Sequence, residues 1–152
     1  TPFNAWLLIR GLRTLPARLE RVSETARKVV GFLKGRDEIE EVSFPFDEDF
    51  PQYPLAKKQM QGSGGLFSFV VKAKTIREIE NFCEGLQHIL MAVSWGGHES
   101  LIIPGCASIQ EREFDPASKI HRRVRMYVGL EDPADLIDDL DQALIAYREA
   151  VG

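Results

Sequence analysis

Two short segments of the sequence carry side chains that could bind or act on a small molecule. The first is Ser94–Leu101, read as SWGGHESL, in which a hydroxyl and an indole precede two glycines. Glycine lets the backbone turn sharply or approach a ligand closely, although a glycine pair more often marks an ordinary turn. The second is Arg125, which alternates with apolar residues. Its planar guanidinium suits a carboxylate, and an ion pair with a surface acid is the alternative interpretation.

Other candidate sites have weaker support. The run Gly62–Gly65 is rich in glycine but leads into an expected strand, whereas a phosphate-binding loop opens a helix with Lys-Ser/Thr, so we expect a flexible loop. The three histidines lack metal-ligand spacing, and we expect no metal site. Cys83 and Cys106 are too few for a disulfide framework, which favours reduced thiols that fill the core of a cytoplasmic protein.

The composition is that of a folded, water-soluble domain. A chain of 152 residues with 44% hydrophobic and 28% charged residues suffices for one hydrophobic core. The net charge of −4 and the interleaving of basic with acidic residues argue against nucleic acid as a partner. Apolar runs are far shorter than the ~20 residues that span a bilayer, so we expect no membrane segment.

Hydrophobic spacing predicts the elements that must position these residues. A long amphipathic helix is expected over residues 6–33, kinked or divided at Pro16 and stopped at Gly35. A second helix begins at the capping box of Thr75 and Glu78 and continues to residue 89, and a third follows Asp132-Pro133. Alternating patterns predict strands at residues 41–44, 66–72, 92–95 and 123–128, and a proline-rich surface loop is expected at residues 45–54.

Together these elements predict an α+β fold. It is a two-layer sandwich, in which helices cover one face of a small, mostly antiparallel sheet. Successive side chains of a strand point to opposite faces, so Val124, Met126 and Val128 are expected to pack on the helices. Arg125 is then expected to face away from the core.

Four blocks, in order, resemble the transsulfuration family of fold-type-I pyridoxal-phosphate (PLP) enzymes, which act in cysteine and methionine metabolism. The blocks are PFNAWLLIRGLRTL at residues 2–15, GLFSF at 65–69, SWGGHESL at 94–101 and RMYVGLED at 125–132. The resemblance implies the C-terminal domain of such an enzyme. Residues 1–34 would form the interdomain helix, and residues 35–152 would form the substrate-binding domain.

The resemblance also assigns roles to residues. In the family, the serine of the SxGGxES block and the arginine of the RxxVGLED block hold the substrate's α-carboxylate, which implies Ser94 and Arg125 here. Trp95 would add an aromatic wall. The Ser-Trp pair and Val93, where γ-acting members often have Glu, resemble cystathionine β-lyase. γ-Replacement on an activated homoserine and a binding module without catalysis remain alternatives.

No lysine of this chain stands in the Ser-x-Thr-Lys context of the family's cofactor lysine. The resemblance therefore implies that PLP is held by a large domain outside this chain. The fragment itself is expected to contain no catalytic residue, to bind no PLP and to be inactive. The implied partners are that large domain, a sulfur amino-acid substrate and further copies of the intact protein, which by family is a homotetramer.

Overall fold

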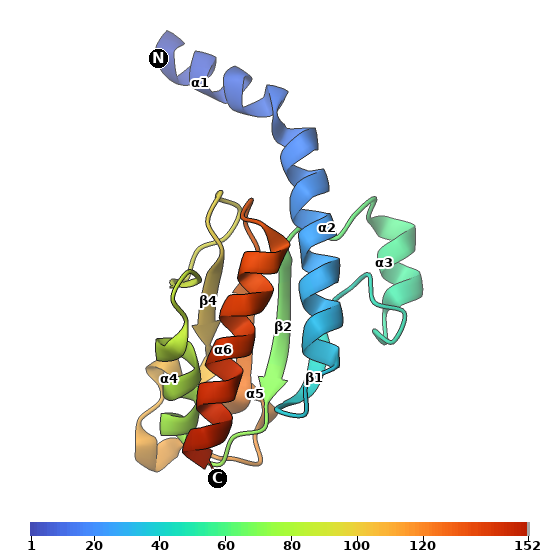
Figure 1. Ribbon diagram of the computed structural model, residues 1–152. Coiled ribbons are helices and arrows are strands. Elements are labelled where there is room, and N and C mark those ends of the chain that lie inside the picture. The colour runs from blue at the N-terminus through green and yellow to red at the C-terminus, as the bar shows by residue number, and fades with distance from the viewer. Residues whose placement is uncertain (152) are drawn as a thin grey trace.

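The protein is described by a computed structural model that covers residues 1–151. One five-stranded sheet is covered on one face by helices α2, α4 and α6, whereas α1 projects away from the body (Figure 1). The helices are α1 (Pro2–Arg13), α2 (Leu15–Lys34), α3 (Tyr53–Gln59), α4 (Ile76–Gly85), α5 (Lys119–Arg122) and α6 (Pro133–Val151). The strands are β1 (Ile39–Ser43), β2 (Leu66–Val71), β3 (Leu90–Met91), β4 (Leu101–Pro104) and β5 (Arg123–Tyr127).

The sheet confirms the predicted α+β architecture. Its strand order is β1-β2-β5-β4-β3, and all neighbouring strands are antiparallel except the short pair β3 and β4. The central strand β5 pairs with β2 on one side and β4 on the other. Because β5 has hydrogen-bonded neighbours along both edges, side chains that project from it are held on a rigid base.

The core lies between the sheet and the helices. Val124, Met126 and Val128 are fully buried, as the alternation predicts. They meet aromatic side chains of β2 and α4, where the Phe69 and Phe82 rings pack edge to face at 6.1 Å. The face of α2 that joins this core consists of Val22, Ala26, Val29, Val30 and Leu33. Burial of this apolar surface is what fixes the helices on one side of the sheet.

The first predicted helix is divided, and the break lies at Thr14. Pro16 lies in the first turn of α2, where its missing N–H costs no hydrogen bond. The backbone N–H of Thr14 donates to the Gly11 carbonyl at 3.3 Å, and the Arg18 guanidinium donates to the same oxygen at 3.0 Å. These contacts close the end of α1 and fix the angle between the two helices.

Two strand predictions need correction. The strand expected at residues 92–95 is displaced, because the strand here is β3 at Leu90–Met91, and the chain leaves the sheet after Ala92 donates to the Ile102 carbonyl at 3.0 Å. Strand β4 was not predicted at all. Its four residues, LIIP, include a proline and show no alternation, and they form a strand by pairing with β5.

Two helix predictions also need correction. Residues 53–59 form α3, with Pro54 in its first turn, instead of continuing the expected loop. Helix α4 starts at the predicted Thr75 cap, whose hydroxyl accepts from the Glu78 N–H at 3.3 Å, but it ends at Gly85 instead of residue 89. Ile89 still reaches the core, because a buried carboxylate on α6 binds the backbone of the intervening turn.

Candidate functional site

Arg125 projects from the middle of β5, on the face of the sheet opposite to the core. Its neighbours across the sheet are Ser68 on β2 and Ile103 on β4. The adjacent Val124 and Met126 are both fully buried, so the strand has no freedom to rotate the arginine inward. The predicted orientation of Arg125 is therefore observed.

The Arg125 guanidinium contacts the loop that follows β3. One terminal nitrogen donates to the Val93 carbonyl, and the guanidinium carbon lies 5.4 Å from the centre of the Trp95 ring. No acidic side chain that the structure describes forms an ion pair with Arg125. Because its positive charge has no acidic neighbour, it remains available to an anionic ligand.

The neighbouring arginines differ from Arg125 in their surroundings. Arg122 is buried, with its guanidinium bonded to the Glu40 carboxylate and to the Val71 carbonyl at 3.1 Å. Arg123 is exposed. The geometry separates Arg122 from Arg125, since Arg122 has a permanent acidic partner and Arg125 has none among the described residues.

Ser94 lies between the two residues that contact Arg125. It is exposed, and it is flanked by Val93, whose carbonyl accepts from the guanidinium, and by Trp95, whose ring lies beside it. The structure thus places the loop segment that bears Ser94 beside Arg125, with the Trp95 ring next to the guanidinium. A hydroxyl, an aromatic face and an unneutralised guanidinium form a suitable set of groups for binding a carboxylate.

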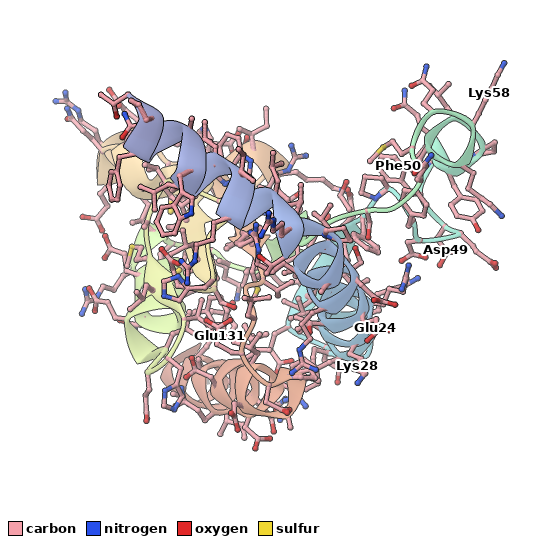
Figure 2. All side chains as sticks on the ribbon, turned by 90° about the horizontal axis from the view of Figure 1, so that it is seen from above. Glu24, Lys28, Asp49, Phe50, Lys58 and Glu131 are labelled. Carbon is pink, nitrogen blue, oxygen red and sulfur yellow. The ribbon has the colours of Figure 1, made fainter. Side chains whose placement is uncertain are left out.

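The loop after Trp95 is fastened to the end of β5 by a buried hydrogen-bond cluster. The Glu131 carboxylate accepts from the Ser100 N–H at 2.6 Å and from its hydroxyl at 2.8 Å, and that hydroxyl accepts from the Gly129 N–H at 2.9 Å. The Leu130 N–H donates to the His98 carbonyl at 2.8 Å. Figure 2 shows the molecule from above the view of Figure 1 and labels Glu131.

Glycine is required at position 129 by this close approach. A Cβ atom there would overlap the His98 carbonyl oxygen and would lie 2.6 Å from the Glu131 carboxylate. The sequence indicates both blocks separately, but it does not predict that Ser100, Gly129 and Glu131 join them. The sequence feature that could have indicated this contact is a hydroxyl residue, Ser100, in one block and an acid, Glu131, in the other.

Trp95 also lines a pocket. It measures about 330 Å³ and is bounded by the first turns of α2, the glycine turn at residues 63–65 and the second glycine turn at 96–97. Trp95, Tyr127 and Arg18 line it, and Arg18 is the single charged residue among the lining. The Tyr127 hydroxyl donates to the Gly97 carbonyl at 3.1 Å, and burial raises the pKa of Tyr127.

Two lysines of this chain are poorly suited to act as the cofactor lysine of a PLP enzyme. Such a lysine needs a lowered pKa so that the free amine is available. Hydrogen bonds to Asp47 and Asp49 instead raise the pKa of Lys34, and Glu41 and Glu40 raise that of Lys119. No lysine lines the pocket beside Trp95.

The part of the chain that the structure describes lacks three other kinds of functional feature. It contains no cluster of three or more His, Cys, Asp or Glu residues suited to a metal ion. Both cysteines are free and buried, and burial raises the pKa of Cys83 to about 12, which makes it a poor nucleophile. None of its helices is long and apolar enough to cross a membrane.

Comparison with known proteins identifies the family to which the chain belongs. The pattern of the Cys/Met metabolism PLP-dependent enzyme family matches residues 1–145. Cystathionine gamma-lyase of Bos taurus is 37% identical over 150 residues, which cover 96% of this chain and 37% of that protein. A putative cystathionine beta-lyase of Rhizobium johnstonii is 35% identical over 149 residues, covering 95% of this chain and 37% of that protein.

A solved structure shows the same architecture. The crystal structure of cystathionine gamma synthase from Xanthomonas oryzae pv. oryzae, in complex with aminoacrylate and cysteine, superposes with a TM-score of 0.83 at 33% identity. The match covers 97% of this chain and 39% of that one. This chain thus spans well under half the length of the relatives it matches.

Proposed function

Because the chain belongs to the Cys/Met metabolism PLP-dependent enzyme family, we propose that it is the substrate-binding domain of a carbon–sulfur lyase. Cystathionine is the substrate we propose for the whole protein, with β-elimination as the reaction. The support for β-elimination is the Ser94-Trp95 pair preceded by Val93. γ-Replacement on an activated homoserine is the second candidate, and the similarity to a cystathionine gamma synthase favours it.

In this proposal the α-carboxylate of the substrate binds between the Arg125 guanidinium and the Ser94 hydroxyl. The observation that carries it is that Arg125 has no acidic partner among the described residues and lies against the loop that bears Ser94. Arg125 would bind both carboxylate oxygens, Ser94 would donate one further hydrogen bond, and Trp95 would exclude water from one side.

The cofactor lies outside this chain in the proposal. When bound, PLP supplies the electron sink that stabilises a carbanion at the substrate's Cα. Since no lysine here stands in the Ser-x-Thr-Lys context of the family's cofactor lysine, we propose that a larger domain of the whole protein holds PLP, and that this chain alone binds none and is inactive. After incubation with PLP and dialysis, the purified chain should show no yellow absorbance, and a stable absorbance at one PLP per chain would contradict the proposal.

Helix α1 supports a domain partner. Six of its apolar side chains are exposed, and none of its residues is buried: the exposed ones are Phe3, Trp6, Leu7, Leu8, Ile9 and Leu12. Exposed apolar surface of this extent normally packs on another protein surface. We propose that residues 1–34 lead from the large domain into this one, with α1 on the large domain and α2 in the core of the small domain. Assembly into a homotetramer and a cytoplasmic location belong to the same proposal.

Substitution of Arg125 in the full-length protein tests the assignment. Removing one member of a buried charge pair costs roughly 2–5 kcal/mol, so Arg125→Gln should lower kcat/KM for cystathionine by at least about 30-fold. Arg123→Gln removes the same charge from an exposed position two residues away and should leave kcat/KM nearly unchanged. Equal effects of the two substitutions would refute the carboxylate role.

The products of the same assay separate the two reactions. β-Elimination of cystathionine with water yields pyruvate, ammonia and homocysteine. γ-Replacement instead joins cysteine or sulfide to an acylhomoserine and releases the acyl group as a free acid. Incorporation of the thiol without pyruvate release would favour the second candidate.

A further inference from the structure

Tyr127 has contacts that neither the sequence blocks nor the proposed function explains. It lies two residues after Arg125 on β5 and projects from the same face of the strand. The side chain is nearly buried, and its hydroxyl donates to the Gly97 carbonyl at 3.1 Å. Its ring lies so close to Gly65 that a Cβ atom there would be 3.1 Å from the Tyr127 Cε2 atom.

The bond from Tyr127 reaches the glycine turn of the loop, one residue before the His98 carbonyl that Leu130 holds. Gly96 has a φ of +89°, a conformation that glycine adopts freely, and a Cβ at this position would meet no atom within 4 Å. Steric contacts of a side chain therefore do not fix the backbone conformation at Gly96. The hydroxyl of Tyr127 fixes the next carbonyl group instead.

The same strand anchors the loop on both sides of the proposed carboxylate-binding residues. Before Ser94, the Val93 carbonyl accepts from Arg125, and after Trp95, the Gly97 carbonyl accepts from Tyr127. Both anchoring side chains project from β5, which is paired along both edges. Hydrogen bonds from two side chains of one rigid strand thus hold the carbonyl groups on either side of the segment 94–96.

We propose that Tyr127 is a positioning residue, whose hydroxyl holds the Gly96–Gly97 turn so that Ser94 and Trp95 stay against Arg125. This inference rests on the proposed role of Arg125 and Ser94 in carboxylate binding. Without this hydrogen bond the turn samples further conformations. Ligand binding then has to order the turn, and the entropy lost in doing so weakens the affinity. Tyr127 acts on the ligand through the loop and does not need to touch it.

The chain offers a matched control for the test. Tyr147 is also buried, and its hydroxyl also donates to a backbone carbonyl, that of Lys72, which is in a different part of the fold. Tyr127→Phe and Tyr147→Phe each remove one such hydroxyl and keep the ring. Both are made in a Trp6→Phe background, which leaves Trp95 as the sole tryptophan.

Two measurements are made on the whole chain. Trp95 fluorescence is titrated with L-methionine, and backbone amide hydrogen exchange is followed at residues 96–99. Tyr127→Phe should weaken L-methionine binding by about 3–10-fold and should speed exchange in the loop. Tyr147→Phe should lower the urea midpoint of unfolding while leaving affinity and loop exchange unchanged.

The outcomes separate the two proposals. If Arg125→Gln abolishes the fluorescence response while Tyr127→Phe behaves like Tyr147→Phe in both measurements, the positioning role is wrong and the carboxylate site stands. The proposed function fails if the unsubstituted chain gives no fluorescence response to L-methionine. It also fails if Arg125→Gln responds as strongly as the unsubstituted chain. Loop exchange in Tyr127→Phe still decides whether the hydroxyl holds the turn.

Discussion

The carboxylate of Asp139 on α6 organises the turn that leads into β3 and the Ser94 loop. It is buried and accepts from the backbone N–H groups of Gln87 at 2.7 Å, His88 at 2.9 Å and Ile89 at 2.9 Å. In Asp139→Asn one oxygen becomes an amide that faces N–H donors, so at least one buried donor loses its acceptor. Each such loss costs about 1–3 kcal/mol, and we expect Asp139→Asn to lower the free energy of unfolding by about 2–4 kcal/mol at pH 7.

The effect should depend on pH in a definite direction. Burial alone would raise the pKa of Asp139, but the hydrogen bonds from the three N–H groups outweigh it and hold the pKa below its ordinary value. The folded protein therefore binds this proton less readily than the unfolded chain, whose aspartates have a pKa of about 3.9. The stabilisation is complete well above that value and is lost as the pH falls through the folded-state pKa.

Urea unfolding curves at several pH values test this reasoning. At an m-value of about 2 kcal/mol/M, the midpoint of Asp139→Asn should lie about 1–2 M below that of the unsubstituted chain at pH 7. The gap should narrow below about pH 4. Asp138→Asn is the control, because Asp138 is exposed on the same helix and its change should stay within about 0.5 kcal/mol. A gap that is equal at pH 3 and pH 7 would refute the charge-based account.

Two further substitutions test packing at the site and at α1. Gly129→Ala should destabilise the fold and abolish the fluorescence response to L-methionine, because a Cβ atom there overlaps the His98 carbonyl. Gly31→Ala on α2 is the control, because its Cβ meets no atom within 4 Å, and it should raise the free energy of unfolding by about 0.5–1 kcal/mol. Equal midpoints for the two variants would refute this interpretation. Leu8→Glu should reduce the concentration-dependent association of the chain in sedimentation experiments without lowering its stability, since Leu8 is 70% exposed. Unchanged association would show that copies of the chain do not associate through α1.

Elements with a strong repeating pattern were predictable from the sequence. The alternation around Arg125 correctly gave both the strand and the face on which the arginine projects, and the Thr75 cap correctly placed the start of α4. The four family blocks led to the family that the comparisons identify. In each case the signal is local, because a period of two or a cap at a fixed offset is set by neighbouring residues.

Features that depend on distant residues were missed. The end of α4 at Gly85 is set by Asp139, which lies more than fifty positions later in the sequence. Strand β4 exists because β5 pairs with it, although its own residues do not alternate. The link between Ser100 and Glu131 likewise joins two blocks that were evident separately. The tertiary context supplies information in these places that no local pattern contains.

The proposed site separates recognition of an amino acid from the choice of reaction. Every amino-acid substrate carries an α-carboxylate, so the clamp formed by Arg125 and Ser94 would serve β-elimination and γ-replacement equally well. Relatives named for different reactions accordingly match this chain at similar identities of 37% and 35%. The choice must depend on groups beyond the substrate's Cα. Trp95 contacts Arg125 and also lines the neighbouring pocket, so in this proposal it connects the carboxylate site to the pocket on whose groups the choice of reaction would depend.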